Sequence, residues 1–372
     1  MKKIIVIAIL MVMIIPLHVK AEVKLIENPG TPKSKDAGRI IIPEEEMLIT
    51  DEEGDFYFKS PGRIKVAPDE SIFVTDENQF LRFDKNGKFL NNQFKKGQGP
   101  GEYTYILNYQ FIGDKIVIFT SQPYKIVETD IKGNLLKETR LREKMGFKRI
   151  LGIVKDKFWL VSSSFQNILK RNTGSFTLNL ELAWGTLDGK VEKTGIIFPE
   201  KWYMKKTVMK GGGVAVGMKS VVSSAFVMDA SIYLYVSNTQ EYMIHQVDLE
   251  QIKVIRKFNR KYTSIAFRDE RTEEEKKQRT IGSDPKYFSD IQKVIICGGQ
   301  LWVLTSTIDR EKGILVDVFL KDGNYIDNFY FKLPGVTRIK DLEYKPFTCY
   351  QDFLFTVEED EEGNKFIVKY KI

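Results

Sequence analysis

The chain is poor in the residues from which metal centres and disulfide scaffolds are built. Among 372 residues there are two cysteines, Cys297 and Cys349, and two histidines, of which only His245 lies beyond the N-terminal segment. Two cysteines do not make a disulfide-rich scaffold. A single histidine leaves little for a histidine-based catalytic site, and its position two residues from Val247 in a strand-like run predicts a packing role.

A dense basic segment is also missing. Lys and Arg number 57 against 50 Asp and Glu, which gives a formal net charge of +7. No Lys/Arg-rich block stands out along the chain, so nucleic acid is not an expected partner.

A run long enough to span a bilayer is absent as well. The longest apolar run, residues 4–17, is interrupted by Pro16 and is too short to span. It follows Lys2 and Lys3 and precedes a small-residue site that ends at Ala21, which is typical of a secretory signal peptide. We therefore predict a signal peptide over 1–21, an extracytoplasmic protein, periplasmic or secreted, and no stable membrane insertion after cleavage. A retained anchor is the alternative. Cleavage would remove three lysines and no acid, so the net charge would fall from +7 to +4.

What the chain does contain is short β-runs separated by turns. Residues 22–38 form a polar leader, and after residue 39 long helical periodicity is missing. A first unit over 64–90 has four runs and turns at 68–70 and 85–87, and residues 109–136 repeat it. Further units recur with inner strands near Ile150, Ser224, Val294 and Leu342.

Six such four-stranded units predict an all-β, six-bladed β-propeller over 39–372. The sixth unit stops at Ile372, one strand short, and 39–58 contains β-runs that belong to no unit. An N-terminal strand from this segment would complete the last blade and remove its open edge.

A glycine-rich stretch, residues 97–103, connects the first two units. Its glycines supply unusual backbone conformations and Pro100 fixes one φ. We expect Glu102 to bind local backbone N–H groups and Tyr103 to insert into the next sheet. The predicted structural motif consists of Gly97, Gly99, Pro100, Gly101, Glu102 and Tyr103.

The repeated unit followed by Gly-Gln-Gly-Pro-Gly-Glu-Tyr resembles the bacterial exported six-bladed β-propeller family, relatives of NHL-repeat proteins. The likeness covers most of the chain and is sharpest in the first two units. It implies the fold and export, whereas the biochemical role in this family is largely unassigned.

Candidate binding residues lie where the connections between units are long. Residues 195–222 and 259–290 each join a fourth strand to the next first strand, on the face that also carries 97–105. Arg63, Arg149 and Arg338 stand at or just before first strands on that face. They predict a mildly basic opening of the central channel, which would bind an anionic ligand or an acidic segment of a partner protein. Solvated rim arginines are the alternative interpretation.

Metal-dependent catalysis has weaker support. Asn108 and Asp341 are oxygen ligands on predicted inner strands, so calcium in a central channel is possible, but no repeated oxygen set accompanies them. The leading hypothesis is a non-catalytic binding propeller outside the cytoplasm. Its alternatives are a lactonase-like propeller hydrolase or lyase with a channel metal, and a structural subunit of an envelope complex.

Three local predictions complete the sequence analysis. Cys297 and Cys349 occupy equivalent positions in neighbouring units, which we expect to lie beyond the reach of a disulfide. Residues 211–220 have part of the phosphate-loop spacing without its strand–loop–helix context, and are interpreted as a flexible basic loop. Residues 272–280 carry a capping box and predict a short surface helix, with a disordered charged loop as the alternative.

Overall fold

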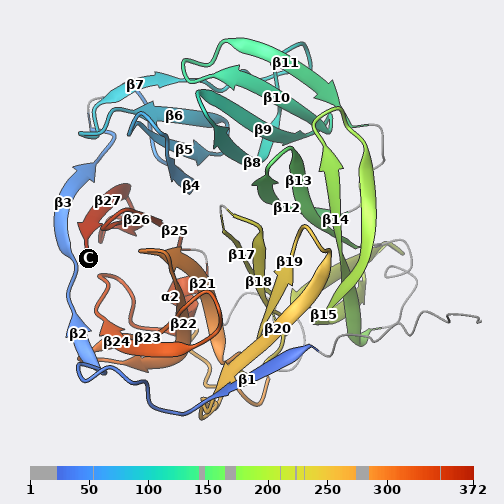
Figure 1. Ribbon diagram of the computed structural model, residues 1–372. Coiled ribbons are helices and arrows are strands. Elements are labelled where there is room, and N and C mark those ends of the chain that lie inside the picture. The colour runs from blue at the N-terminus through green and yellow to red at the C-terminus, as the bar shows by residue number, and fades with distance from the viewer. Residues whose placement is uncertain are drawn as a thin grey trace, which may run out of the picture.

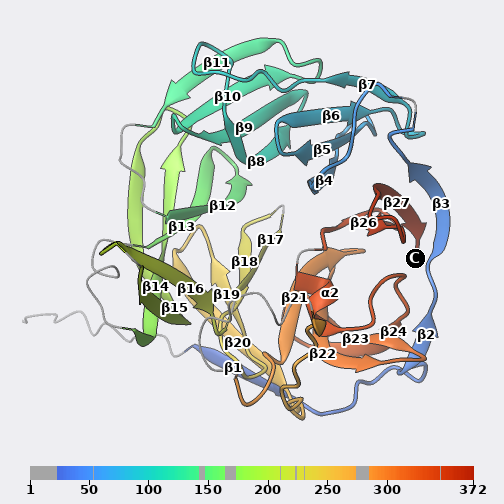
Figure 2. The same cartoon turned by 180° about the vertical axis from the view of Figure 1, so that it is seen from behind.

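The computed structural model describes residues 23–372 except 53, 142–146, 164–172, 210, 223, 230, 274–284 and 344. The predicted signal peptide and most of the predicted helix over 272–280 lie outside the described residues. The described residues form six sheets arranged in a ring around one axis, as Figures 1 and 2 show from the two sides. The predicted all-β propeller with six blades is confirmed.

Each blade has an antiparallel core whose strands follow one another in chain order from the axis outwards, and N-terminal strands are added at the outer edge of three blades. The first three blades comprise β4 (Pro61–Val66), β5 (Ile72–Asp76), β6 (Gln79–Phe83) and β7 (Phe89–Asn92); β8 (Tyr105–Ile112), β9 (Lys115–Ser121), β10 (Lys125–Asp130) and β11 (Leu135–Arg140); and β12 (Phe147–Val154), β13 (Lys157–Ser163), β14 (Gly174–Thr186), β15 (Val191–Val208) and β16 (Val214–Ser220).

The other three blades also contain the N-terminal strands. They comprise β17 (Ala225–Met228), β18 (Tyr233–Ser237), β19 (Ile244–Asp248), β20 (Lys253–Arg260) and β1 (Lys24–Asn28); β21 (Ile291–Cys297), β22 (Gln300–Asp309), β23 (Gly313–Phe319), β24 (Tyr325–Phe331) and β2 (Arg39–Ile41); and β25 (Phe347–Tyr350), β26 (Phe353–Glu359), β27 (Lys365–Lys371) and β3 (Glu44–Ile49).

The core lies between blades rather than inside one sheet. Phe73 and Phe80 of the first blade pack with Tyr109 of the second, and the Phe80 and Tyr109 rings are 4.8 Å apart in an edge-on contact. A strand covered on both faces needs apolar residues at successive positions rather than alternate ones. The middle strands have this composition, since Ile72, Phe73 and Val74 are all buried.

The predicted closure of the ring is confirmed. β3 pairs antiparallel with β27, with Ile49 opposite Ile367, so the N-terminal strand completes the last blade. Blade 6 thereby consists of three C-terminal strands and one N-terminal strand, and its open edge is removed.

Three blades have five strands instead of the expected four, and two of the extra strands come from the N-terminus. β1 adds in parallel to β20 of blade 4, and β2 adds in parallel to β24 of blade 5. The segment interpreted as a polar leader therefore contributes β1 to a blade. The sequence pattern missed it because an outermost strand leaves one face exposed, and β1 is mostly polar.

The third extra strand corrects the interpretation of residues 195–222 as a long loop. Residues 195–208 continue β15, and β16 pairs back against it, with Val208 opposite Val214. The phosphate-loop-like residues 211–220 are therefore the turn and second strand of a hairpin at the outer edge of blade 3.

The inner strand of blade 6 is also not where the sequence predicted it. Leu342 lies in a short helix, α2 (Ile339–Glu343), and the first strand is β25. The alternation of apolar residues around Leu342 fits one helical turn as well as a strand, and such short runs are ambiguous.

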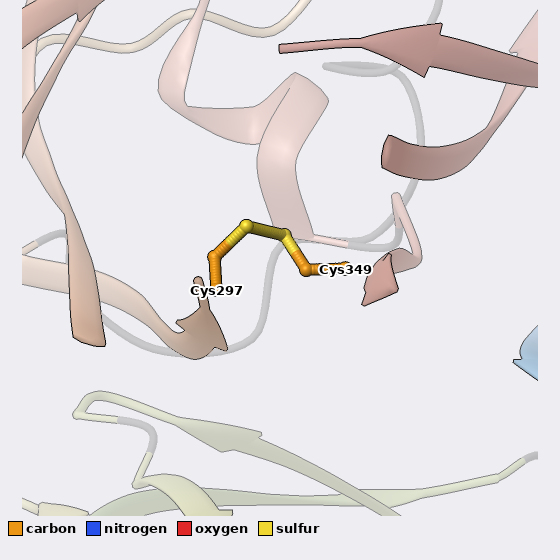
Figure 3. The surroundings of a disulfide bond; sticks show 2 residues. All are labelled: Cys297 and Cys349. Atoms are coloured by element: carbon orange, nitrogen blue, oxygen red, sulfur yellow. A yellow bond between two sulfur atoms is a disulfide. The ribbon is translucent and has the colours of Figure 1, made fainter. Parts of the chain in front are cut away.

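Cys297 and Cys349 form a disulfide, which contradicts the expectation from their spacing. Their Cα atoms are 5.2 Å apart, and the bridge joins β21 of blade 5 to β25 of blade 6 (Figure 3). First strands converge towards the axis of the ring, so equivalent positions on neighbouring first strands come within disulfide distance.

Candidate functional site

The glycine-rich motif is a structural connection between blades 1 and 2. Tyr103 is buried, its hydroxyl donates to the carbonyl of Gln93 at 3.1 Å, and its ring meets Phe94 edge-on at 5.0 Å. Glu102 accepts from the backbone N–H of Gly99 at 2.9 Å. Glu102 therefore binds a local backbone N–H group, as expected, whereas Tyr103 is buried in a cluster between blades 1 and 2 and bonds back to the chain before the motif.

Two residues outside the motif hold it in place. Lys125 is fully buried and its Nζ donates to the Gly99 carbonyl at 2.9 Å and to Glu138 at 2.8 Å. Glu138 in turn accepts from the Gly101 N–H at 2.8 Å. Burial raises the pKa of Glu138, but the hydrogen bonds from Lys125 and Gly101 and the charge of Lys125 outweigh it, so the pKa is lowered.

Asn108 lies on an inner strand as predicted, but its side-chain oxygen and nitrogen already form hydrogen bonds, including bonds to the neighbouring blades. Its Oδ1 accepts from Lys65 Nζ at 3.1 Å and from the Tyr109 N–H at 2.9 Å. Its Nδ2 donates to the Ile150 carbonyl at 3.0 Å. Asn108 therefore joins blades 1, 2 and 3.

Arg338 and Asp341 are partners of each other. Arg338 donates from Nη2 and Nε to Asp341 at 2.7 and 3.0 Å, and Asp341 also accepts from the backbone N–H groups of Thr337 and Arg338. These bonds lower the pKa of Asp341 although burial raises it. All these partners of Asp341 lie in the connection before β25, and none of them is a partner of Asn108. Asp341 and Asn108 therefore do not form a shared ligand set.

The remaining candidates belong to a cluster of cations around the axis of the ring, which we call the axial cations. Its members come from the first strands of blades 1, 3 and 5: Arg63 and Lys65 on β4, Arg149 on β12 and Lys293 on β21. The sequence predicts Arg63 and Arg149 as binding residues but not Lys65 and Lys293.

Three of the axial cations repeat one contact with the blade that follows. Each lies over an aromatic ring at the inner edge of the next blade: Lys65 over Tyr109 at 5.0 Å, Arg149 over Phe226 at 5.3 Å, and Lys293 over Phe347 at 4.7 Å. Each also donates to a backbone carbonyl there, of Tyr109, Ser224 and Lys345 respectively. The six blades are thus linked in three pairs by the same device.

The partners of these cations are neutral. In the described part of the chain, rings, carbonyls and the Asn108 amide surround them, and none forms an ion pair with a carboxylate. Glu200 attracts Arg149 from a distance, but its own oxygens accept from the Ser224 N–H at 3.0 Å and from Trp202 Nε1 at 2.9 Å.

The electrostatics follow from this arrangement. Burial lowers the pKa of Lys65 to about 7, with a further contribution from the charge of Arg63. Burial lowers the pKa of Lys293 to about 8, and the charge of Arg149 lowers it further. Burial also lowers the pKa of Arg149, and the charge of Arg63 lowers it further. Cations of blades 1, 3 and 5 therefore repel one another, and an anion among them would relieve this repulsion.

The connection over residues 259–290 and His245 lie apart from the axial cations. In the described residues of 259–290, the Phe267 and Phe288 rings contact each other at a tilt with centroids 4.9 Å apart, so this connection folds back on itself. His245 lies on β19, where burial and then Lys257 lower its pKa to about 4, so it is neutral at pH 7. Among the described residues, no three His, Cys, Asp or Glu side chains are placed to hold a metal ion. None of the described helices has the length and apolar character of a membrane span.

Two shallow cavities lie at the opposite end of the inner strands. One of about 270 Å³ lies between blades 1 and 6, and one of about 280 Å³ lies beside the disulfide; they share Tyr350 and Gln351. The first includes Lys85 and Glu70, which face each other at 3.8 Å. Their charges offset one another, unlike those of the axial cations.

The comparisons agree with the architecture. The chain is a six-bladed β-propeller: the sequence model of a family described as "6-bladed beta-propeller" matches residues 47–197. Among solved structures, it is similar to a protein described as exported from Bacteroides fragilis, with 13% identity, a TM-score of 0.51, and coverage of 94% of this chain and 99% of that one.

A second similar structure is a member of the DUF4221 family from Bacteroides vulgatus. It has 11% identity and a TM-score of 0.56, and the match covers 91% of this chain and 99% of that one. At such identities the two structures show the fold alone. No curated protein matches the chain. The resemblance to six-bladed propellers is thus confirmed, and the relation to NHL repeats stays a prediction.

Proposed function

We propose that this protein is an extracytoplasmic binding propeller that holds an anionic ligand, carrying carboxylate or phosphate groups, against the axial cations. One observation carries the proposal: cations from blades 1, 3 and 5 lie near one another around the axis, and their hydrogen-bond and ring partners are all neutral. A bound oxyanion would offset their mutual repulsion, and arginine and lysine are the usual partners of such groups.

Location outside the cytoplasm is supported by three features. The N-terminal segment has the pattern of a signal peptide. Cys297 and Cys349 form a disulfide, which is typical of oxidising compartments. The similar protein from Bacteroides fragilis is described as exported.

A binding role is favoured over the metal-dependent hydrolase or lyase. That alternative uses Asn108 and Asp341 as calcium ligands. The Asn108 oxygen already accepts from Lys65 Nζ, a cation, and Asp341 is paired with Arg338. Calcium would have to displace both partners before it could bind.

The test is isothermal titration calorimetry of the full chain, once with citrate and once with inorganic phosphate. We expect Arg149→Gln combined with Lys293→Gln to weaken binding of whichever anion the wild type takes by at least about tenfold, because two of the four charges are lost. Lys85→Gln is the matched control, since Lys85 is exposed at the opposite end and its loss leaves the axial cations intact.

Either of two binding results, or a crosslinking result, would overturn the proposal. One is a wild type that binds neither anion at low ionic strength. The other is an affinity that falls with Lys85→Gln and not with the double variant, or a ligand whose crosslinks map to 68–69 and 85–87. Citrate binding without phosphate binding would assign a carboxylate ligand, and the reverse would assign a phosphate.

A further inference from the structure

The hairpin formed by β15 and β16 extends beyond the blade to which it belongs. β15 pairs with β14 as far as Met204, opposite Gly174, and among the described strands its last four residues pair with β16 alone. Figure 2 shows β16 at the periphery of the ring. Met204 is buried in the blade core, so the hairpin has a fixed base and a projecting end.

The projecting end is apolar and exposed. The exposed fractions are 75% for Val208, 56% for Met209, 57% for Val214 and 37% for Val216. Val208 and Val214 are direct cross-strand partners, so their side chains lie on the same face of the ribbon. At the turn, side chains added to any of the three glycines 211–213 would meet no atom within 4 Å. The tip therefore stands clear of the part of the molecule that the structure describes.

Positive charge lies immediately behind the tip. Residues 201–220 contain five lysines and no aspartate or glutamate, a formal charge of +5 in a chain whose net charge is +7. Lys205 and Lys219 are exposed on the face of the ribbon opposite to Val208 and Val214. Lys205 is three residues from Val208, about 10 Å along the strand.

We propose that the β15–β16 hairpin docks the protein on an anionic lipid surface, with Val208, Met209 and Val214 at the boundary of the acyl chains and the lysines among the headgroups. The distance of about 10 Å between tip and lysine matches the depth to which surface-bound apolar groups enter a bilayer. Lysines at that level are attracted by anionic headgroups.

A lipid surface fits this shape better than a protein partner. The exposed valines and the methionine are carried by a narrow tip rather than by a groove or a flat patch. A folded partner would need a pocket that encloses the tip, whereas a fluid apolar medium surrounds it without a matching shape. The formal charge of +5 selects a negatively charged surface.

The experiment is vesicle flotation of the full chain. Vesicles of phosphatidylcholine containing phosphatidylglycerol at about one lipid in three are compared with vesicles of phosphatidylcholine alone. Each variant has the same N-terminus as the wild type, so any contribution from residues 1–21 is common to all samples. The wild type is expected to float with the anionic vesicles, and raised salt should weaken this binding.

Three double variants separate the contributions. Val208→Ser with Val214→Ser should reduce binding by at least about tenfold through loss of buried apolar area. Lys205→Gln with Lys219→Gln should reduce it by about fivefold per charge, on anionic vesicles only. Leu135→Ser with Leu136→Ser, at exposed leucines on β11, is the matched control and should leave binding unchanged.

The proposal fails if the wild type does not float with anionic vesicles, or if the valine variant floats as well as the wild type. It also fails if the wild type stays free of lipid and elutes as a dimer that the valine variant dissociates, because β16 would then pair with a second copy. The altered side chains are exposed, so the melting temperature of each variant should match that of the wild type and exclude unfolding as the cause.

Discussion

The guanidinium of Arg149 lies 5.3 Å from the ring centroid of Phe226 and donates to the Ser224 carbonyl, so blade 3 is joined to blade 4 by a cation. Lys65 makes the equivalent contact from blade 1 to blade 2, and Lys293 from blade 5 to blade 6. The same side chains are thus both inter-blade links and the source of the positive potential at the axis. Substitutions at these positions should therefore change both the stability of the fold and the affinity for an anion, and both must be measured.

The first prediction concerns pH. The folded-state pKa values of Lys65 and Lys293 are lowered to about 7 and about 8 from the ordinary lysine value of 10.5. Between these values and 10.5 the unfolded chain holds more protons, so the free energy of unfolding rises with pH over that window. For Lys65 we expect on the order of 2 kcal/mol between pH 7 and pH 9.5, after discounting for partial exposure.

Urea unfolding at stepped pH values checks this, with Lys65→Met as the comparison. The variant keeps the bulk of the side chain and loses its charge, so its stability should rise less steeply above pH 7. The groups that face Lys65 are Arg63, Asn108 and Tyr109, and burial raises the pKa of Tyr109 well above its ordinary value, away from this window. His245 titrates near pH 4, below the window. Identical slopes in wild type and variant would contradict the prediction.

The same titration bears on ligand binding. An oxyanion favours the protonated lysines, so affinity should be highest below pH 7 and should decline from pH 7 to pH 9 as Lys65 and then Lys293 lose their protons. Calorimetry with the anion bound by the wild type measures this. Affinity that stays constant to pH 9 would assign the binding to arginine or to another part of the molecule.

A second prediction concerns the glycine-rich motif, where the structure refines the choice of residue. Gly101 has φ +70°, whereas Gly99 has no left-handed φ. Gly101→Val should therefore destabilise the fold by about 1–3 kcal/mol. Gly97→Ala should also be harmful, because a Cβ there would lie 1.9 Å from a Glu102 carboxylate oxygen. Denaturant unfolding of both variants checks this, and anion binding should persist wherever the fold does.

Tyr103 provides a graded control for the same motif. Tyr103→Phe keeps the buried ring and loses only the hydrogen bond to Gln93, at a cost of about 1 kcal/mol. Tyr103→Ala empties the site and should cost about 3 kcal/mol or more. If both variants melted like the wild type and lost ligand instead, the motif would have a binding role.

A third prediction concerns the disulfide. Its cysteines are 52 residues apart in sequence, and a loop of that length corresponds to about 4 kcal/mol in the loop-closure treatment, with measured values often lower. Cys297→Ser with Cys349→Ser should therefore lower the free energy of unfolding by about 2–4 kcal/mol. Reduction of the wild type should have the same effect and none on the variant. Equal stability in all samples would show that other contacts suffice to hold blades 5 and 6 together.

The fold could be predicted from the sequence because each blade of a propeller repeats the same short-range pattern of strands and turns. Turns such as 84–88 and 130–134 recur at fixed places, and the middle strands are apolar at successive positions. Contacts between distant segments left no such signal. β1 pairs with β20 more than 200 residues away, and the disulfide depends on how closely first strands converge.

The candidate site was predicted in part for the same reason. Arg63 and Arg149 could be singled out because each precedes an apolar inner-strand residue. Lys65 follows Arg63 by two residues and therefore shares its side of β4, so the alternation of a strand is enough to predict it. Lys293 could not be found without knowing that Phe347, 54 positions later, would lie beneath it. Arg338 and Asp341 were grouped separately, although their spacing of three residues suits the ion pair they form.

The last prediction concerns the N-terminal strands. The segment interpreted as a polar leader contributes β1 to blade 4, so its removal should be destabilising. Asn28 at the end of β1 links two blades: its Nδ2 donates to the carbonyls of Asn259 at 2.8 Å and Gly323 at 3.0 Å, and its Oδ1 accepts from the Tyr325 N–H at 3.0 Å. Deletion of residues 23–38 should expose the edge of β20 and lower the melting temperature by several degrees.

Deletion of residues 23–50 should do more, because it also removes β3 and opens the ring between blades 6 and 1. Ile49 is buried opposite Ile367, so its loss exposes core as well as an unpaired edge, and aggregation is expected. Asn28→Ala serves as the point control, with a cost of about 1–3 kcal/mol for three lost hydrogen bonds. Scanning calorimetry and size-exclusion chromatography distinguish the three proteins. Equal stability of the two truncations would refute closure by β3, and a wild-type melting curve for Asn28→Ala would show that β1 contributes no link between blades 4 and 5.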